Sequence, residues 1–205
     1  TRLIETIATL MGGRAAEDLI FHEFTTGASS DLSIASRTAR EMVTELGIKR
    51  TETILDYGCA KGFLVKALRL LHHTAHGYDV SKYAVSSAPE DMRGYLFDHW
   101  RPHQFDWIIS KDVLEHVPYD ELDGVIKTIY DSCKNAFIVV PLGDGKKYNA
   151  PEYEKDATHI IREPLGWWWA KFVQAGFGEV ATRTNIKHIK VSRCKDSDGF
   201  FVLRR

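Results

Sequence analysis

The stretch ILDYGCAKGFLVKAL, residues 54–68, decides the fold of this 205-residue chain. It opens with a short β-branched and apolar run that stops at Gly58, and from residue 63 its apolar residues recur at helical spacing. The stretch therefore predicts a strand, a glycine turn and a helix. Asp56, Gly58 and Gly62 lie where the strand gives way to the helix, which is the edge of an open α/β sheet at which ligands bind.

Strand and helix patterns alternate through the rest of the chain after Thr51. Apolar runs predict further strands at residues 75–80, 95–98, 105–110 and 135–141. Helical spacing predicts helices from residue 81, over residues 122–133, where Cys133 ends the apolar stripe, and from Pro164 to Ala175. This alternation implies an α/β fold with a parallel sheet covered on both faces. Residues 179–189 and 199–205 predict an antiparallel pair of strands at the sheet edge.

Residues 1–49 differ in pattern from the rest of the chain. Their apolar residues recur at helical spacing, interrupted at Gly12 and Gly13, and no strand is predicted before Thr51. A long helix is expected over residues 32–46, with Ser29 or Ser30 as its N-cap and Gly47 at its end. We therefore divide the chain into a helical segment, residues 1–49, and an α/β domain, residues 50–205.

Composition excludes several classes of protein. A formal net charge of -1 gives no general electrostatic reason to expect nucleic acid or an acidic membrane as a partner. Three cysteines without C-x-x-C spacing argue against a disulfide framework or a zinc knuckle, and fit a reducing compartment. No apolar run approaches the roughly 20 residues that span a bilayer. These observations predict a soluble cytoplasmic protein.

Two acidic motifs follow the first two strands. The glycine turn reads D-x-G-x-x-x-G with Ala60 in the middle, which is not the dinucleotide fingerprint G-x-G-x-x-G. Asp79 ends the second strand, at a separation from Asp56 that suits a carboxylate binding a ribose diol. Taken alone, a glycine turn after a strand is common, and an acidic residue there is often only a helix cap. In this order, the two together favour a nucleoside site.

The strings ILDYGCAKGFLVKAL, GYDVSKYAVSSAP and FDWIISKDVLEHVP resemble three ordered motifs of class I S-adenosylmethionine-dependent methyltransferases. The resemblance covers about three quarters of the chain. It implies a Rossmann-like, mostly parallel seven-stranded sheet with an antiparallel last strand, and S-adenosylmethionine across the carboxyl edge. Ala60 departs from the family pattern, which has glycine there.

The resemblance also implies a set of cofactor-binding residues. Around the methionine moiety it places Asp56, Gly58, Cys59, Ala60 and Gly62, with Ser110, Lys111 and Asp112 on the methionine side. Asp79 would hold the ribose hydroxyls, and the neighbours of the adenine would be Val80, Phe97 and Asp98.

Two histidines are candidates for catalysis. His116 follows the fourth strand, and His159 lies in the insert between the fifth strand and the tryptophan helix, which in this family often covers the acceptor. Histidine titrates near neutral pH and can remove a proton from a hydroxyl or an ammonium group. Each histidine could instead make a structural hydrogen bond, and Glu115 is interpreted as structural. Trp167–Trp169 are expected to divide between the core and the acceptor wall, and no metal ligands are predicted.

The N-terminal segment resembles a different family. TLMGGRAAEDLIFHEFTTGASSDLSIASRTAREMVTELGI is similar to the peptidase domain of the FtsH-type AAA+ zinc proteases, in which the aspartate at the position of Asp31 is a zinc ligand. The 205 residues contain neither an H-E-x-x-H motif nor an ATPase domain, and adjacent His22 and Glu23 do not replace that motif. We interpret residues 1–49 as a fused remnant that packs on the domain or mediates homodimer contact.

The main hypothesis is therefore a methyltransferase that uses S-adenosylmethionine and acts on an oxygen or nitrogen of a small molecule, such as a sugar or another metabolite. The alternatives are a methyltransferase-like protein that binds the cofactor without turnover and, third, a zinc metalloprotease. Neither nucleic acid nor a membrane is expected as a partner. A shared fold does not identify the acceptor.

Overall fold

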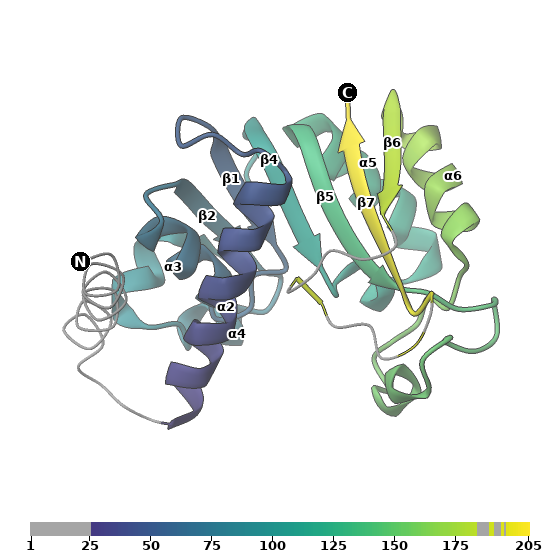
Figure 1. Cartoon of the computed structure of the whole chain (residues 1–205), viewed down its shortest axis with the longest axis horizontal. Helices are drawn as coiled ribbons and strands as arrows, with labels where there is room; N and C mark the ends of the chain where they lie inside the picture. Colours follow the sequence, from purple (N-terminus) through teal and green to yellow (C-terminus); the bar gives the residue numbers. More distant parts are fainter. Residues whose placement is uncertain (1–25, 184–188, 191–193, 195) are drawn as a thin grey trace, which may run out of the picture.

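The computed structural model of the chain describes residues 26–183, 189–190, 194 and 196–205, and within them seven strands form one sheet (Figure 1). Their order across the sheet is β3-β2-β1-β4-β5-β7-β6. Strands β1 to β5 run parallel, whereas β7 is antiparallel to both β5 and β6. The strands are β1 (Thr53–Tyr57), β2 (Thr74–Tyr78), β3 (Leu96–Phe97), β4 (Phe105–Lys111), β5 (Cys133–Pro141), β6 (Glu179–Arg183) and β7 (Asp198–Arg204). The expected α/β fold is confirmed.

Helices connect the strands and cover the sheet. The α-helices are α2 (Thr26–Glu45), α3 (Phe63–Leu70), α4 (Lys82–Ser86), α5 (Tyr119–Ser132) and α6 (Leu165–Ala175). The short 3-10 helices are η1 (Glu90–Tyr95), η2 (Leu114–His116) and η3 (Pro151–Lys155). None of the described helices is long and apolar enough to cross a membrane.

Alternate residues of the strands pack into two separate cores. Ile54 of β1 belongs to the core under α2 and α3, whereas the next residue, Leu55, belongs to the core under α5 and α6. Both side chains are fully buried. This pattern follows from the two-residue period of a strand, and it makes the fold a sheet between two layers of helices.

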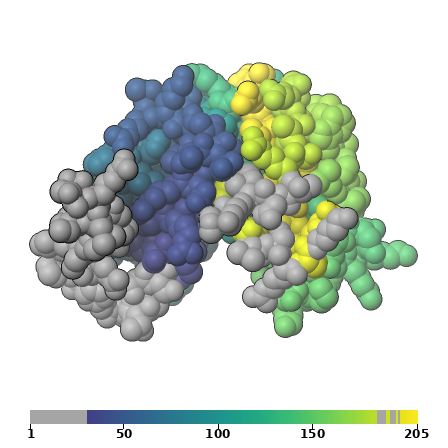
Figure 2. All heavy atoms as spheres, viewed as in Figure 1, coloured from purple at the N-terminus to yellow at the C-terminus, as the bar shows by residue number. Residues whose placement is uncertain are grey.

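Helix α2 packs into the domain core. Ala39 and Met42 are fully buried and Leu46 nearly so, in the same core as Ile54 and Leu68. Burying a side chain the size of methionine stabilises a fold by about 1.5–3 kcal/mol. Figure 2 shows the outer side of α2, in purple and blue, at the surface of this face. The described part of residues 1–49 thus has the packing role expected of it, while homodimer contact stays a prediction.

Three local expectations need correction. Helix α2 begins at Thr26, so Ser29 and Ser30 lie inside its first turns and the predicted N-cap is wrong. Cys133 does not belong to the helix but begins β5 in extended conformation, because the strand follows α5 without a loop. Its side chain is buried, as it would also be on the apolar face of a helix. The strand expected over residues 179–189 is found at Glu179–Arg183, and residues 184–188 lie outside the described part of the chain, as do His22 and Glu23.

Candidate functional site

The glycine turn after β1 is built on left-handed backbone. Gly58 has φ +85° and Gly62 has φ +77°, a region that glycine enters without steric cost. A Cβ at Gly58 would also lie 2.3 Å from Cγ2 of Val113, so this side chain leaves no room for any residue larger than glycine. Ala60 adopts φ 47°, a left-handed conformation that favours glycine.

Hydrogen bonds to Asp79 link this turn to the end of β2. One carboxylate oxygen accepts the backbone N–H of Ala60 at 2.8 Å, and the other accepts the N–H of Ser81 at 2.8 Å. The N–H groups of Gly58 and Cys59 donate to the carbonyl of Tyr78 at 2.7 and 3.0 Å. Ser81, not Asp79, caps α4, which argues against the simple cap interpretation. Each carboxylate oxygen retains a further lone pair for a ligand.

Buried ionisable and polar side chains lie next to the turn. Burial raises the pKa of Asp56 to about 7, although the positive charge of Lys111 opposes the shift. Burial also raises the pKa of the Cys59 thiol, with Asp56 adding to the effect. Ser110 is fully buried, and its hydroxyl has no hydrogen-bond partner within the described residues. The predicted methionine side therefore holds one carboxyl group, that of Asp56, whose pKa is near neutral, and the unsatisfied hydroxyl of Ser110.

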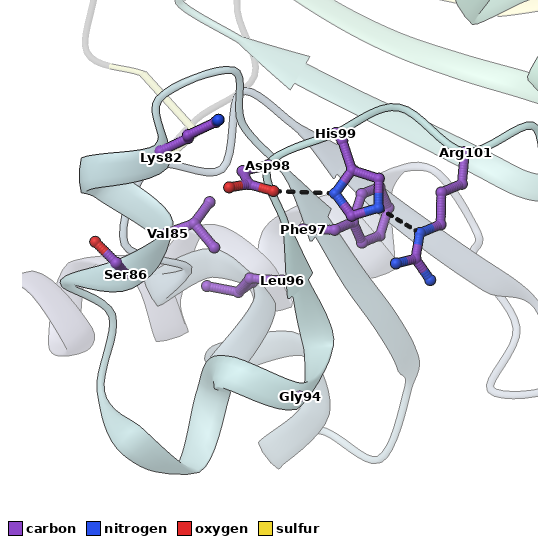
Figure 3. A pocket seen from close by; sticks show the side chains of 9 residues that line it. All are labelled: Lys82, Val85, Ser86, Gly94, Leu96, Phe97, Asp98, His99 and Arg101. Carbon is purple, nitrogen blue, oxygen red and sulfur yellow. Dashed lines mark hydrogen bonds and ion pairs between the residues drawn. The ribbon is translucent and has the colours of Figure 1, made fainter.

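A cavity of about 350 Å³ lies beside β3 and α4 (Figure 3). Phe97 and Asp98, two of the predicted adenine neighbours, are among its lining residues. Asp98 bonds to Nδ1 of His99 at 3.0 Å, and Arg101 donates to Nε2 of the same ring at 2.7 Å. Val80, the third predicted neighbour, is 80 % exposed and outside this cavity.

Beyond β4, the chain brings together the two predicted histidines. The ring centroids of His116, in η2, and His159, in the insert of residues 142–164, lie 4.7 Å apart. Nε2 of His159 lies 4.0 Å from Oε1 of Glu115. Burial, followed by the charge of His116, lowers the pKa of His159, which favours the neutral ring. Burial and then Asp112 raise the pKa of Glu115 to about 8.

The environment of Asp112 was missed by sequence reasoning. Asp112 pairs with Lys111 and with Lys190, and Lys190 also pairs with Asp198 at 2.8 Å. Tyr153 of the insert donates to Asp198 at 2.6 Å. Burial alone would lower the pKa of Lys190, but its two carboxylate partners raise it. Lys111 is the neighbour of Asp112 in the chain, but Lys190 lies 78 residues away, so no local motif marks this ion pair.

The tryptophans of α6 differ in burial, which confirms the core part of the expected division. Trp168 is fully buried and stacks on Phe172, whereas Trp169 is 43 % exposed and donates to the carbonyl of Val180. Trp167 is half-buried, and its ring meets that of Tyr119 edge-on. A role of any of them in the acceptor wall stays a prediction.

Two family models match parts of the chain. Residues 55–139 match the family model of a methyltransferase domain, and residues 1–75 match that of peptidase family M41. The ATP-dependent zinc metalloprotease FtsH of Rhodococcus erythropolis is 42% identical over 78 residues, 37% of this chain and 9% of FtsH. The chain thus spans about a tenth of that relative. Because the two family matches overlap, the boundary at residue 49 stays a prediction.

Structural comparisons find the same architecture in known methyltransferases. A SAM-dependent methyltransferase from Archaeoglobus fulgidus superposes with a TM-score of 0.64 at 14% identity, covering 82% of this chain and 92% of that one. Magnesium protoporphyrin IX methyltransferase (ChlM) from Synechocystis PCC 6803, solved with bound SAM, superposes with a TM-score of 0.58 at 15% identity, covering 94% and 91%. The chain therefore has the Rossmann-like fold of these S-adenosylmethionine-dependent methyltransferases, with residues 55–139 similar to a methyltransferase domain and residues 1–75 similar to peptidase family M41.

Proposed function

We propose that this protein transfers a methyl group from S-adenosylmethionine to an oxygen or nitrogen of a small-molecule acceptor. The observation that carries the proposal is the glycine turn at the carboxyl edge of β1 and β2, in which the N–H of Ala60 donates to Asp79. The residues of this edge fit the cofactor. Asp79 has lone pairs for a ribose diol, Phe97 and Asp98 line an adjacent cavity, and the carboxylate of Asp56 suits a cationic ligand.

The bound cofactor supplies an activated methyl on a sulfonium, so the chain mainly has to align the acceptor and exclude water. Asp56 and Asp79 would surround the positive charge with carboxylates. The side chain of Val113 packs against Gly58, and Glu115, two residues further along the chain, lies together with His116 and His159. The acceptor would bind between these two groups, under the insert.

A histidine can act as the base if the acceptor arrives protonated. Nδ1 of His159 lies 3.0 Å from the carbonyl of Tyr153, and a carbonyl only accepts, so this nitrogen carries the hydrogen. Nε2 of the neutral ring then keeps a free lone pair. Nδ1 of His116 lies 3.2 Å from the carbonyl of Thr158 and 2.9 Å from its hydroxyl oxygen. That hydroxyl donates to Asp156, so both Thr158 oxygens accept from the ring. Both rings are therefore oriented with Nε2 available for proton removal or another ligand.

The acceptor is proposed to be a small metabolite. The methyltransferase from Synechocystis acts on magnesium protoporphyrin IX, and its fold is shared here. The net charge of -1 gives no reason to expect nucleic acid. A panel of sugars and other hydroxylated or amino metabolites, assayed with methyl-labelled cofactor, is the direct search for the acceptor.

Isothermal calorimetry with S-adenosylmethionine and S-adenosylhomocysteine tests the cofactor. We expect stoichiometric binding of both, and no binding at millimolar ligand to folded protein would overturn the proposal. Binding without transfer to any acceptor of the panel would favour a protein that holds the cofactor without turnover. A protease would instead cleave casein in a zinc-dependent way and lose that activity in Asp31→Ala.

A further inference from the structure

Glu115 is a buried carboxylate that the proposed reaction leaves unexplained. Its side chain is 1% exposed, and neither carboxylate oxygen has a hydrogen-bond partner within the part of the chain that the structure describes. Removing such a group from water without a partner is costly, and native folds keep one mainly where an ion, a water or a reaction needs it. Glu115, in η2, therefore calls for a partner.

Two histidines meet at this carboxylate. Glu115, His116 and His159 each offer a ligand atom, and the three atoms lie within 4.8 Å of one another. The carbonyls of Thr158 and Tyr153 hold the hydrogen on Nδ1 of the two rings, which leaves each Nε2 with a free lone pair. In metal sites, a ligating histidine almost always donates its other N–H in this way, which fixes its tautomer and orientation.

We propose that Glu115, His116 and His159 form a binding site for a divalent transition-metal ion such as Zn²⁺. Two imidazoles and one carboxylate are a common ligand set for this class of ion and leave a coordination position open. With bonds of about 2.0–2.2 Å, tetrahedral ligand atoms lie roughly 3.4 Å apart. The separation of 4.0 Å between His159 and Glu115 needs to shorten by only a small side-chain rotation.

The surrounding charges suit a cation at this place. Asp112 is already paired with Lys111 and Lys190, so we expect Glu115 and not Asp112 to be the carboxylate ligand. Oδ2 of Asp156 lies 3.7 Å from Nε2 of His159 and adds negative charge beside the cluster. If the protein is a methyltransferase as proposed above, the open coordination position would bind an acceptor oxygen and lower its pKa, which favours hydroxylated acceptors.

Metal titration of the full chain tests the site without any assay of turnover. After treatment with a chelator, the protein is titrated with Zn²⁺ by calorimetry and with Co²⁺ by visible absorption. We expect one equivalent of each, with the Co²⁺ spectrum of mixed nitrogen and oxygen ligands. Glu115→Gln and His159→Asn should each weaken binding at least tenfold.

Matched controls separate this site from adventitious binding. His72→Asn changes an exposed histidine whose φ of 64° asparagine tolerates, and Asp31→Ala changes the position of the protease-type zinc ligand. Both controls should bind like the wild type, and all four variants should still bind S-adenosylhomocysteine, which shows that they fold. The proposal is overturned if the wild type binds no stoichiometric ion, or if Glu115→Gln and His159→Asn bind as tightly as His72→Asn.

Discussion

The cofactor edge and the acceptor cluster differ in how the chain builds them. The cofactor edge joins the turn of residues 58–62 to Asp79, so it comes from two consecutive strand ends. The acceptor cluster joins Glu115 and His116 to His159, which the chain reaches only after α5, β5 and most of the insert. A local motif thus specifies the first, whereas tertiary packing assembles the second. The two should also respond separately to mutation.

The largest expected effect is on turnover at the acceptor cluster. His159→Asn removes the free Nε2 beside Glu115, whether it serves as a base or as a metal ligand. Loss of a general base typically lowers turnover by about 10²–10⁴-fold. Affinity for S-adenosylhomocysteine should change less than twofold, since the cofactor edge is untouched. Steady-state kinetics with the acceptor from the panel measures the loss of turnover, and calorimetry measures the cofactor affinity. Equal losses of turnover and of cofactor affinity would show that the two regions are not independent.

Asp79→Ala should have the converse effect. It removes a charged acceptor from the ribose diol, and two charge-assisted hydrogen bonds of about 1.5–3 kcal/mol each correspond to one to a few decades in cofactor affinity. The structure adds a second loss, because the N–H groups of Ala60 and Ser81 also lose their partner. Calorimetry with S-adenosylhomocysteine measures the change.

Asp31→Ala is the matched control for this substitution. Asp31 is exposed on α2, and among the described residues it belongs to no metal-ligand group. Its removal should leave cofactor affinity unchanged. Equal losses in the two variants, or no loss in Asp79→Ala, would refute the assignment of β2.

A pH effect of intermediate size is expected from Asp56. Burial raises its pKa from 3.8 to about 7, so the folded state binds a proton that the unfolded state has released. The resulting stabilisation is complete below about pH 4 and is lost as the pH rises through about 7, an amount of about 2–3 kcal/mol between pH 5 and pH 8. Asp56→Asn should lack this loss. Denaturant unfolding at both pH values tests it, and parallel pH profiles for the two proteins would contradict it.

The smallest effect is expected at Ala60. A left-handed residue other than glycine costs about 1–2 kcal/mol, part of which glycine returns through the greater freedom of the unfolded chain. Because Ala60 has φ 47°, Ala60→Gly should stabilise the protein by up to about 1 kcal/mol with cofactor affinity within twofold. Chemical denaturation measures the shift. A destabilisation of more than about 1 kcal/mol would show that the methyl group makes a contact of its own.

The fold and the cofactor edge could be predicted because their signals are local. The strand before Gly58 and the helix after Gly62 follow from periodicity over a few residues, and Asp79 follows from its place at a strand end. The end of α5 was misplaced because the buried side chain of Cys133 fits a helix stripe and a strand equally well. The ion pairs of Lys190 with Asp112 and Asp198 have no sequence signal, since only the folded chain brings them together.

The most direct test of the central claim is a crystal structure of the protein with S-adenosylhomocysteine. We predict ribose hydroxyls within hydrogen-bond distance of the Asp79 carboxylate, the homocysteine part along the turn of residues 58–62, and the adenine beside Phe97 and Asp98. The cluster of Glu115, His116 and His159 would then face the sulfur without touching the ribose. Ligand bound elsewhere, with Asp79 still fastened only to Ala60 and Ser81, would contradict the account.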